Sequence, residues 1–375
     1  MRNARKEQMT IVTSLLMLGR RNTGVKQDVF SPLIDLTIGD IPFIRKANPR
    51  YVDISFLGAH DANTGISTRG AELEPATSDA LKKAEPFLRN YLYRYVKTQT
   101  ATVYDLLQYG CRFLHIKVTR AHGTFYTSHS VLTGELKTHV LDLLRFLSER
   151  KHAGEIVSVL FQCIDLSDLC FADLHDFLAG ISYDGKTLYD YVHYAPVDEF
   201  GRGEGIKIGN LRYDDIVSDN GENGVVLFQR RDKHYLSSWD KRKTDYPFFF
   251  DMDANALHVW HDHSNVRLLD KDIDELTYKI LSSDKYDDLL RMNQTQSSSS
   301  FRTIPDVLAS IYSRSLLKTA EKHNLKLLEK KNLSDMLKAM PVFQVDYLTS
   351  GYGDFNRRIN EAIRSYNEKL VQDLL

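Results

Sequence analysis

Two stretches decide the fold: TVYDLLQYGCRFLHIKV at residues 102–118 and ELKTHVLDLLRFLSERKHAGEIVSVLFQ at residues 135–162. Each begins with apolar residues at helical spacing and passes into a continuous apolar run. We therefore predict a helix followed by a buried strand in each stretch, with Gly110 ending the first helix. Helices that alternate with buried strands in this way favour a parallel sheet or barrel.

Further apolar runs extend this pattern over most of the chain. We predict an α/β fold of the TIM-type (β/α) barrel class, an irregular single domain over residues 49–375 behind an N-terminal extension, residues 1–48. A serine-rich loop at residues 293–300 and a basic, helix-rich segment at residues 316–338 indicate a candidate insertion over residues 293–338. The predicted strands are residues 51–59, 111–118, 125–129, 155–162, 224–229, 257–261 and 341–348, and the predicted helices are residues 102–109, 135–150 and 355–375.

The composition excludes several classes of protein. The chain has 375 residues, of which 42% are hydrophobic and 26% charged, as in soluble globular proteins. Its formal net charge of -1 argues against a nucleic-acid binder, so membrane contact would have to rest on local patches. Three cysteines, Cys111, Cys163 and Cys170, are too few for a disulfide framework and favour a reducing compartment.

The N-terminal residues 1–21 contain an apolar run with basic flanks. We interpret them as a short helix and not as a signal peptide, because Arg20 and Arg21 follow the run at once and no small-residue cleavage site is evident. No stretch of the sequence reaches the roughly 20 apolar residues of a membrane span. A cytoplasmic or peripheral-membrane location is therefore expected in preference to secretion.

Two histidines follow predicted strands. His60 comes directly after the strand at residues 51–59, and His129 ends the segment YTSHS. Barrel enzymes carry their active sites at the carboxyl ends of the strands. Because histidine has an ordinary pKa of about 6.5, one ring can accept a proton while the other donates one near neutral pH. Such a pair suits the cleavage of a phosphodiester.

The order of these landmarks resembles the X domain of phosphatidylinositol-specific phospholipase C, in its metal-independent bacterial form. The resemblance implies a TIM-type barrel that cleaves an inositol phospholipid, with the inositol 2-hydroxyl as the attacking group and diacylglycerol and a cyclic inositol phosphate as products. The matching segments are LGAHDANTG, QTATVYDLLQYGCRFLHIKV, YTSHS and LKTHVLDLLRFLSERKHAGEIVSVLFQ, followed more faintly by NGVVLFQRR, ALHVWHDHSN and VFQVDYLTSGYGDFNRRINEAIRSYN.

The resemblance assigns roles to four residues around the reacting bond. His60 matches the general base for the 2-hydroxyl, and His129 matches the general acid for the glyceryl oxygen. Asp346, in FQVDYL, matches the carboxylate that orients the base histidine. Asp61 matches the acidic neighbour of the acid histidine.

Lys117 stands where the metal-independent enzymes carry an arginine that neutralises the phosphate. A lysine keeps the charge but loses the bidentate fork, which implies tighter geometry or lower activity. The animal enzymes instead have calcium-binding carboxylates at the equivalents of His115 and Lys117. Because a lysine there repels calcium, we expect no metal and no cofactor.

Headgroup binding is implied for a second set of residues. Arg230 or Arg231, after GVVLFQ, and Asp262, in HVWHDH, resemble contacts to inositol hydroxyls, with an ordinary solvated charge as the alternative interpretation. Gln162 stands where the bacterial enzymes have a substrate-binding lysine. The phospholipid need therefore not be phosphatidylinositol itself.

Two further substitutions distinguish the chain from the family pattern. His115 replaces an acidic residue, and Ala59 replaces the common threonine before the first histidine. Arg112 and Glu155 are expected to be structural, with Arg112 forming an ion pair near the barrel. These differences put the headgroup specificity in question more than the cleavage chemistry.

The histidines 258, 261 and 263 form a separate cluster around Asp262. On a strand only His261 and His263 share a face, and the spacing does not match the metallohydrolase pattern. We therefore do not expect a zinc site in this cluster.

Two other functions remain open at this point. The chain could be a catalytically weak X-domain protein that binds phospholipid headgroups, a reading that the substitutions at His115 and Gln162 motivate. It could also be a metal-dependent glycerophosphodiesterase on the same barrel, although that enzyme needs carboxylates where His115 and Lys117 stand. The favoured hypothesis is a monomeric phospholipase that contacts the membrane surface transiently and binds no nucleic acid.

Overall fold

The computed structural model describes twelve segments of the chain, all within one compact unit, Pro32–Leu375. Only the backbone is described at residues 171, 231, 316, 318, 319 and 322. The predicted helix near the N-terminus, Cys170, Asp262 and His263 lie outside the described residues. The described segments are residues 38–68, 70–79, 81–83, 85–86, 96–164, 171–196, 205–231, 248–259, 261, 265–296, 316–349 and 355–375.

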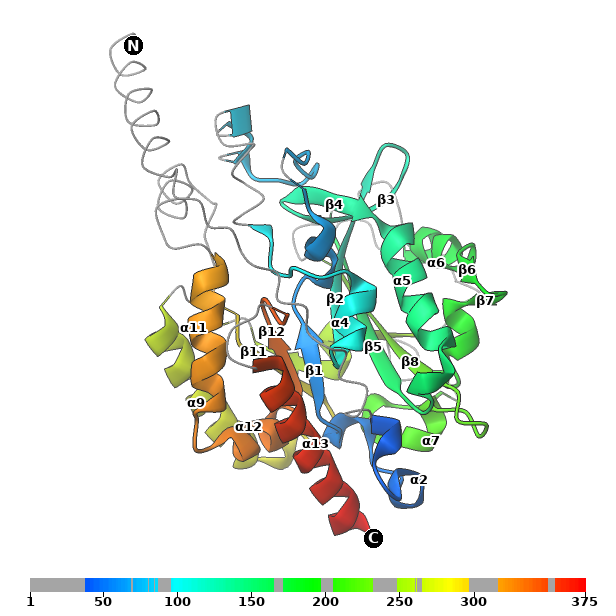
Figure 1. The fold of residues 1–375 in the computed structure, drawn as a ribbon, viewed down its shortest axis with the longest axis vertical. Helices are drawn as coiled ribbons and strands as arrows, with labels where there is room; N and C mark the ends of the chain where they lie inside the picture. Colours follow the sequence, from blue (N-terminus) through cyan, green and yellow to red (C-terminus); the bar gives the residue numbers. More distant parts are fainter. Residues whose placement is uncertain are drawn as a thin grey trace. The chain divides into compact units, whose positions relative to one another are not determined.

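One large sheet with helices on its outside forms the fold (Figure 1). Its strands are β1 (Phe56–Ala59), β2 (Cys111–Ala121), β3 (Thr124–His129), β4 (Val131–Glu135), β5 (Ile156–Cys163), β8 (Gly224–Arg231), β9 (Phe249–Asp251), β10 (Ala256–His258), β11 (Leu290–Gln294) and β12 (Val342–Val345). A separate short hairpin contains β6 (Ser182–Tyr183) and β7 (Lys186–Thr187). The helices are α2 (Ile44–Ala47), α4 (Val103–Gln108), α5 (Leu136–Ser148), α6 (Phe171–Ala179), α7 (Tyr213–Ile216), α8 (Met252–Asn255), α9 (Val266–Leu281), α11 (Leu316–Leu328), α12 (Leu333–Ala339) and α13 (Phe355–Leu374).

Eight strands of the sheet run parallel, in the order β10-β11-β12-β1-β2-β5-β8-β9. Apart from β9 and β10, each parallel strand lies beside the next parallel strand in the sequence, and the last, β12, lies beside the first, β1. Within the described residues the ring is open only between β9 and β10. This is the strand order of a TIM-type barrel, so the predicted fold class is confirmed, as a curled and incompletely closed sheet.

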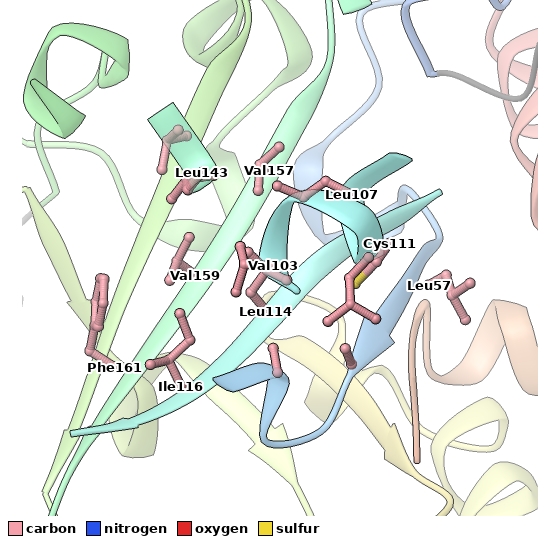
Figure 2. Close-up of a cluster of buried hydrophobic side chains, with 14 of the residues drawn as sticks. Leu57, Val103, Leu107, Cys111, Leu114, Ile116, Leu143, Val157, Val159 and Phe161 are labelled. Carbon is pink, nitrogen blue, oxygen red and sulfur yellow. The ribbon is translucent and has the colours of Figure 1, made fainter. Parts of the chain in front are cut away.

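Apolar side chains line both faces of the sheet, because successive residues of a strand point to opposite sides. Phe113, Phe228 and Phe250 belong to the cluster inside the barrel. Ile116 and Val159 belong to a second cluster, which lies between the sheet and the helices that cover it (Figure 2). A strand buried on both faces reads as a continuous apolar run, which is why β2, β5 and β8 were predictable.

Gly110 ends α4 as predicted and turns the chain into β2. Its φ of 88° lies in the left-handed region, and a Cβ there would meet the side chain of Asn360 in α13 at 2.6 Å. Arg112, two residues further on, pairs with the buried Glu155 and donates to the carbonyl oxygen of Leu107 at 2.7 Å. The predicted structural role of Arg112 and Glu155 is therefore confirmed.

Several predicted boundaries were wrong in detail. The strand predicted at residues 51–59 is shorter, because Tyr51–Asp53 forms a 3-10 turn and β1 begins at Phe56. The loop predicted at residues 293–300 begins too early, because Asn293 and Gln294 are the buried end of β11. β9 was not predicted, because three residues are too few for a periodic signal. β3 was predicted, but it pairs antiparallel with β2 as the first arm of a hairpin with β4.

The predicted division at residue 48 and the candidate insertion at residues 293–338 stay predictions. Ile38, Ile41 and Ile44 are buried and belong to the cluster inside the barrel. The segment 293–338 contributes the end of β11, helix α11 and most of α12. Among the described helices, none has the length and hydropathy that crossing a membrane would require.

Candidate active site

His60, Asp61 and Asp346 come together where β1 and β12 end. The two strands are parallel neighbours, with Ala59 opposite Val345, and the backbone N–H of His60 donates to the carbonyl oxygen of Val345 at 3.1 Å. The next residues along each strand therefore emerge side by side at its carboxyl end. Asp61 has a φ of 43°, in the left-handed region, so the chain turns sharply directly after His60. Sequence proximity to a strand end thus becomes spatial proximity in the site.

Gln99 holds the same two strand ends together. Its side-chain amide donates to the carbonyl oxygens of His60 and Val345, both at 3.0 Å, and its Oε1 accepts from the backbone N–H of Leu348 at 3.1 Å. Thr98 adds a hydrogen bond from its hydroxyl to the carbonyl oxygen of His60 at 3.0 Å. Neither residue was singled out in the sequence. Gln99 binds residues 39 and 246 positions away, and Thr98 binds one 38 positions away, through contacts that only the fold creates.

Asp61 is the hub of the site. Its Oδ2 lies 2.9 Å from Lys117 Nζ and 3.3 Å from both His60 Nε2 and His129 Nε2. Burial works against ionisation of this fully buried carboxyl, yet the neighbouring His60, Lys117 and His129 hold its pKa well below the usual range. The low pKa favours an ionised carboxylate, which faces three nitrogen-bearing side chains.

His60 stands between two carboxylates. Its Nδ1 lies 2.9 Å from Asp346 Oδ1, and its Nε2 faces Asp61. Burial raises the pKa of Asp346, and His60 opposes that rise. Asp346 is itself positioned by Asn324 of α11, whose side-chain amide donates to the Asp346 carbonyl oxygen at 2.9 Å. With Nδ1 oriented by Asp346, His60 can exchange a proton at Nε2.

His129 enters the site from the hairpin and not from a parallel strand. It ends β3, and its Nδ1 donates to the carbonyl oxygen of Val96 at 2.5 Å, which turns Nε2 toward Asp61. The ring centroids of His60 and His129 are 6.2 Å apart. Burial lowers the pKa of His129 to about 4, although Asp61 opposes this shift. The two predicted catalytic histidines are thus brought together around one carboxylate.

His115, Lys117 and Gln162 form the wall contributed by β2 and β5. Lys117 is opposite Gln162 in the parallel register, so the two side chains share a face of the sheet. Gln162 Oε1 lies 2.8 Å from His115 Nε2, and His115 Nδ1 lies 3.4 Å from Asp61 Oδ1. Burial lowers the pKa of His115 to about 3, so this ring is neutral at neutral pH.

Arg230 lies next to Gln162 in the register between β5 and β8. Its Nε is 3.2 Å from Asp253 Oδ1, in an ion pair that is partly exposed on the Asp253 side. The Arg231 side chain and Asp262 lie outside the described residues. Of the four residues predicted to bind the headgroup, Gln162 and Arg230 therefore lie on the face that carries the histidines.

Two buried polar residues complete the surroundings of Lys117. Asn63 accepts from the backbone N–H of Lys117 at 3.2 Å and donates to Thr133 Oγ1 at 2.8 Å, which ties the turn after β1 to β2 and β4. Glu74 is buried, and burial raises its pKa while Lys117 opposes the rise. Asn63 could have been suspected from its place two residues after Asp61. Glu74 lies in a polar stretch whose sequence carries no comparable signal.

Three buried side chains could hold a metal ion. One ligand atom from each of His60, Asp61 and His115 lies within 4.8 Å of the other two, and no other such group was found among the described residues. In the second histidine cluster, His258 Nε2 lies 3.0 Å from Asp253 Oδ1 and His261 Nδ1 lies 3.9 Å from Asp272 Oδ2. The two histidines thus face different carboxylates.

His139 supports the hairpin that carries His129, and it makes stability depend on pH. Its Nε2 lies 3.0 Å from Thr127 Oγ1 on β3, and burial lowers its pKa to about 4. The unfolded chain, with a histidine pKa of about 6.5, binds this proton first as the pH falls. Stability from this group is therefore full above pH ~6.5 and is lost toward pH ~4.

We expect the free energy of unfolding to fall between pH 7.5 and 5, with His139 contributing roughly 1–2 kcal/mol of the loss. Urea unfolding at the two pH values measures it, with His139→Gln beside the wild type. The variant should show a smaller pH dependence. An unchanged pH dependence in His139→Gln would show that this ring does not couple protonation to folding.

Comparisons with known proteins place the fold. No protein-family model matches the chain, and no curated protein matches it. Among solved structures, a double mutant of the phosphatidylinositol-specific phospholipase C of Staphylococcus aureus aligns over 87% of this chain and 98% of its own, with a TM-score of 0.52 and 15% identity.

A second structure of the Staphylococcus aureus enzyme, solved in a study of its membrane binding, aligns over 84% of this chain and 93% of its own. Its TM-score is 0.51 and its identity is 15%. At this level of identity the likeness concerns the architecture. The chain therefore has the TIM-type fold of bacterial phosphatidylinositol-specific phospholipase C.

Proposed function

We propose that this protein is a phosphodiesterase that cleaves an inositol phospholipid with two histidines, giving diacylglycerol and a cyclic inositol phosphate. One observation carries the proposal: His60 and His129 both face Asp61, and Asp346 binds the far side of His60. The resemblance of the sequence to the phospholipase X domain and the shared fold support it. We further propose that the protein acts as a monomer and contacts the membrane surface transiently.

In the first step His60 acts as the base. Its Nε2 takes the proton of the inositol 2-hydroxyl while the hydroxyl oxygen attacks the neighbouring phosphorus. Asp346, 2.9 Å from Nδ1, keeps the ring oriented and stabilises the positive charge that develops on it. Because nucleophile and phosphate belong to one molecule, the reaction avoids most of the entropic cost of bringing two reactants together.

Lys117 supplies positive charge to the phosphate. Its Nζ lies 2.9 Å from Asp61 Oδ2, which fixes the amine beside both histidines. An ammonium group held in a largely buried site stabilises the charge that builds up on the phosphoryl oxygens. No step of this scheme requires a metal ion.

His129 completes the reaction as the acid. Val96 accepts its Nδ1 proton, so Nε2 is the nitrogen that delivers a proton to the departing glyceryl oxygen. Burial lowers the pKa of His129 to about 4, and the negative charge of a bound phosphodiester is expected to raise it. The substrate therefore helps to protonate the acid that releases its leaving group.

The headgroup of the proposed substrate contacts β5 and β8. Gln162 and Arg230 lie on the same face as Lys117, and Gln162 is a neutral donor and acceptor that suits hydroxyl groups. Arg231 and Asp262 complete the proposed headgroup set on the basis of the sequence resemblance.

The test is to incubate the purified protein with mixed vesicles of phosphatidylinositol and phosphatidylcholine in the presence of EDTA. We expect diacylglycerol in the lipid phase and cyclic inositol phosphate in solution, identified by phosphorus NMR. Parallel vesicles should carry phosphatidylcholine alone, phosphatidylglycerol, or phosphatidylinositol phosphates. Cleavage of another lipid but not of phosphatidylinositol would support the proposed chemistry and contradict the proposed headgroup specificity.

Two outcomes favour the rival functions. Turnover that EDTA abolishes would indicate a metal-dependent glycerophosphodiesterase. Binding to phosphatidylinositol vesicles without turnover of any lipid would indicate a headgroup-binding protein. Either result would overturn the proposed metal-independent cleavage.

A further inference from the structure

We propose that His60, Asp61 and His115 form a binding site for a zinc-type divalent ion, which blocks the site when it is bound. The binding itself is independent of the proposed function, whereas the inhibition rests on it. His115 is the residue that creates the site, because it adds a second ring nitrogen beside Asp61.

The ligand atoms have separations close to those of a tetrahedral zinc site. With zinc–ligand bonds of about 2.0–2.1 Å, neighbouring ligand atoms lie roughly 3.3–3.4 Å apart. His115 Nδ1 is 3.4 Å from Asp61 Oδ1, which matches this separation, and His60 Nε2 is 3.3 Å from Oδ2, the other oxygen of the same carboxylate. One ligand atom from each of the three side chains lies within 4.8 Å of the other two, so small shifts of the side chains on binding would close the remaining gap. A fourth position is left for water.

Both histidines already have the outer partners that metal-bound histidines use. A zinc ligand usually donates its other ring N–H to a carboxylate or a carbonyl oxygen, which fixes the nitrogen that faces the metal. His60 Nδ1 has Asp346 Oδ1 at 2.9 Å, and His115 Nε2 has Gln162 Oε1 at 2.8 Å. These contacts direct His60 Nε2 and His115 Nδ1 toward Asp61 without any rearrangement.

The Asp61 carboxylate provides a second, independent indication that a cation binds here. Its Oδ1 is buried and accepts no hydrogen bond from the described residues. If Nε2 of His115 donates to Gln162 Oε1, a neutral His115 ring presents an unprotonated Nδ1 to this oxygen. Two lone pairs then face each other at 3.4 Å inside the protein, and a cation between them would satisfy both.

Lys117 determines which ions bind and how tightly. Its Nζ contacts Oδ2 of Asp61 and leaves Oδ1 for a metal. The positive charge of Lys117 weakens the binding of every cation. Calcium is excluded in addition because it needs six to eight oxygen ligands, which the site does not offer. Zinc and cobalt, which bind imidazole nitrogen well, keep enough affinity. The site is therefore one for a nitrogen-preferring ion, weakened by a neighbouring ammonium group.

A bound ion would block the proposed chemistry. A lone pair of His60 Nε2 that coordinates zinc is no longer available to take a proton. The ion also lies beside Lys117, where the phosphate is proposed to bind. Zinc is thus expected to act as a reversible inhibitor and not as a cofactor.

The binding test uses the full-length protein without lipid, freed of metal with a chelator and transferred to metal-free buffer at pH 7.5. Zinc binding is measured by calorimetry, and cobalt binding by its visible absorption, which reports nitrogen ligands. The variants are His115→Gln, Lys117→Met and, as a matched control, His122→Gln. His122 is an exposed histidine in the turn between β2 and β3, and its Nε2 contacts Glu72 at 2.8 Å.

We expect one zinc ion per wild-type chain and no calcium binding at the same concentration. His115→Gln should weaken zinc binding by more than about 100-fold, the upper end of the loss from removing only an outer-shell partner. Lys117→Met should tighten it, and His122→Gln should leave it unchanged. Equal affinity in the wild type and His115→Gln, or loss in His122→Gln, would overturn the site.

The inhibition is tested separately, by comparing each protein with itself in zinc and in EDTA. Wild-type turnover should fall with zinc and return with EDTA, while the turnover of His115→Gln should be far less sensitive to zinc. If no lipid is cleaved under any condition, the proposed function fails but the metal titration still decides the site. If zinc binds as expected without affecting turnover, the blocking role is wrong.

Discussion

Replacing His60 with glutamine should reduce turnover of the phospholipid by about 10³–10⁴-fold. His60 Nε2 is the proposed proton acceptor, and Asp346, 2.9 Å from Nδ1, orients the ring for that role. Glutamine keeps a polar side chain of similar size but cannot take the proton. Initial rates of diacylglycerol release from mixed vesicles measure the effect.

The loss must come from chemistry and not from unfolding. His60 is buried, and its backbone N–H and carbonyl oxygen bind Val345, Thr98 and Gln99, contacts that the substitution leaves in place. We therefore expect the circular dichroism spectrum and vesicle binding of His60→Gln to resemble those of the wild type. His122→Gln, an exposed histidine variant, should keep full turnover.

Asp346→Asn tests the orientation of His60 by Asp346 separately from the proton transfer by His60 itself. The ring of His60 remains, but the amide can present its N–H₂ group to Nδ1 and select the wrong tautomer. We expect turnover to fall by about 10²–10⁴-fold, with most of the change in kcat rather than in KM. Wild-type turnover in both His60→Gln and Asp346→Asn would show that the base has been assigned incorrectly.

The parts of the fold that the sequence predicted are those with strong local patterns. β2, β5 and β8 are buried on both faces and read as long apolar runs, and α5 places its apolar residues on one side. The resemblance to the phospholipase X domain paired His60 with Asp346 in advance. The alignment of β1 with β12 then brought them to 2.9 Å.

The parts that escaped prediction depend on contacts distant in sequence. Asn293 and Gln294 are polar, yet the barrel buries them at the end of β11. β9 has three residues, too few for any period to show. Gln99 was assigned no role from the sequence, because its role exists only where β1 and β12 end beside it. Local propensity contains no information about such long-range contacts.

Asp61 shows the same limit within the site. The sequence resemblance assigned it to His129 alone, but the left-handed turn at Asp61 directs its carboxylate also toward His60, Lys117 and His115. A side-chain direction set by one backbone angle cannot be read from neighbouring letters. The carboxylate that appeared to support one histidine is the common counter-charge of the whole site.

Asp61→Asn should therefore affect both turnover and stability. We expect turnover to fall by about 10²–10³-fold, because Lys117 and His129 lose the charge that orients them. The free energy of unfolding should fall by about 2–3 kcal/mol, somewhat less than for a fully buried broken pair, since Lys117 keeps 16% of its side-chain surface exposed. Lipid assays and urea unfolding at pH 7.5 measure the two effects.

A double variant, Asp61→Asn with Lys117→Met, separates these two effects. Removing the ammonium group together with its counter-charge leaves no unpaired lysine in the site, so much of the lost stability should return. Turnover should not return, because the double variant lacks both the charge for the phosphate and the hub between the histidines. If stability and turnover recover together, Asp61 acts only by keeping the barrel folded. If stability alone recovers, the carboxylate has a direct part in organising the reacting groups.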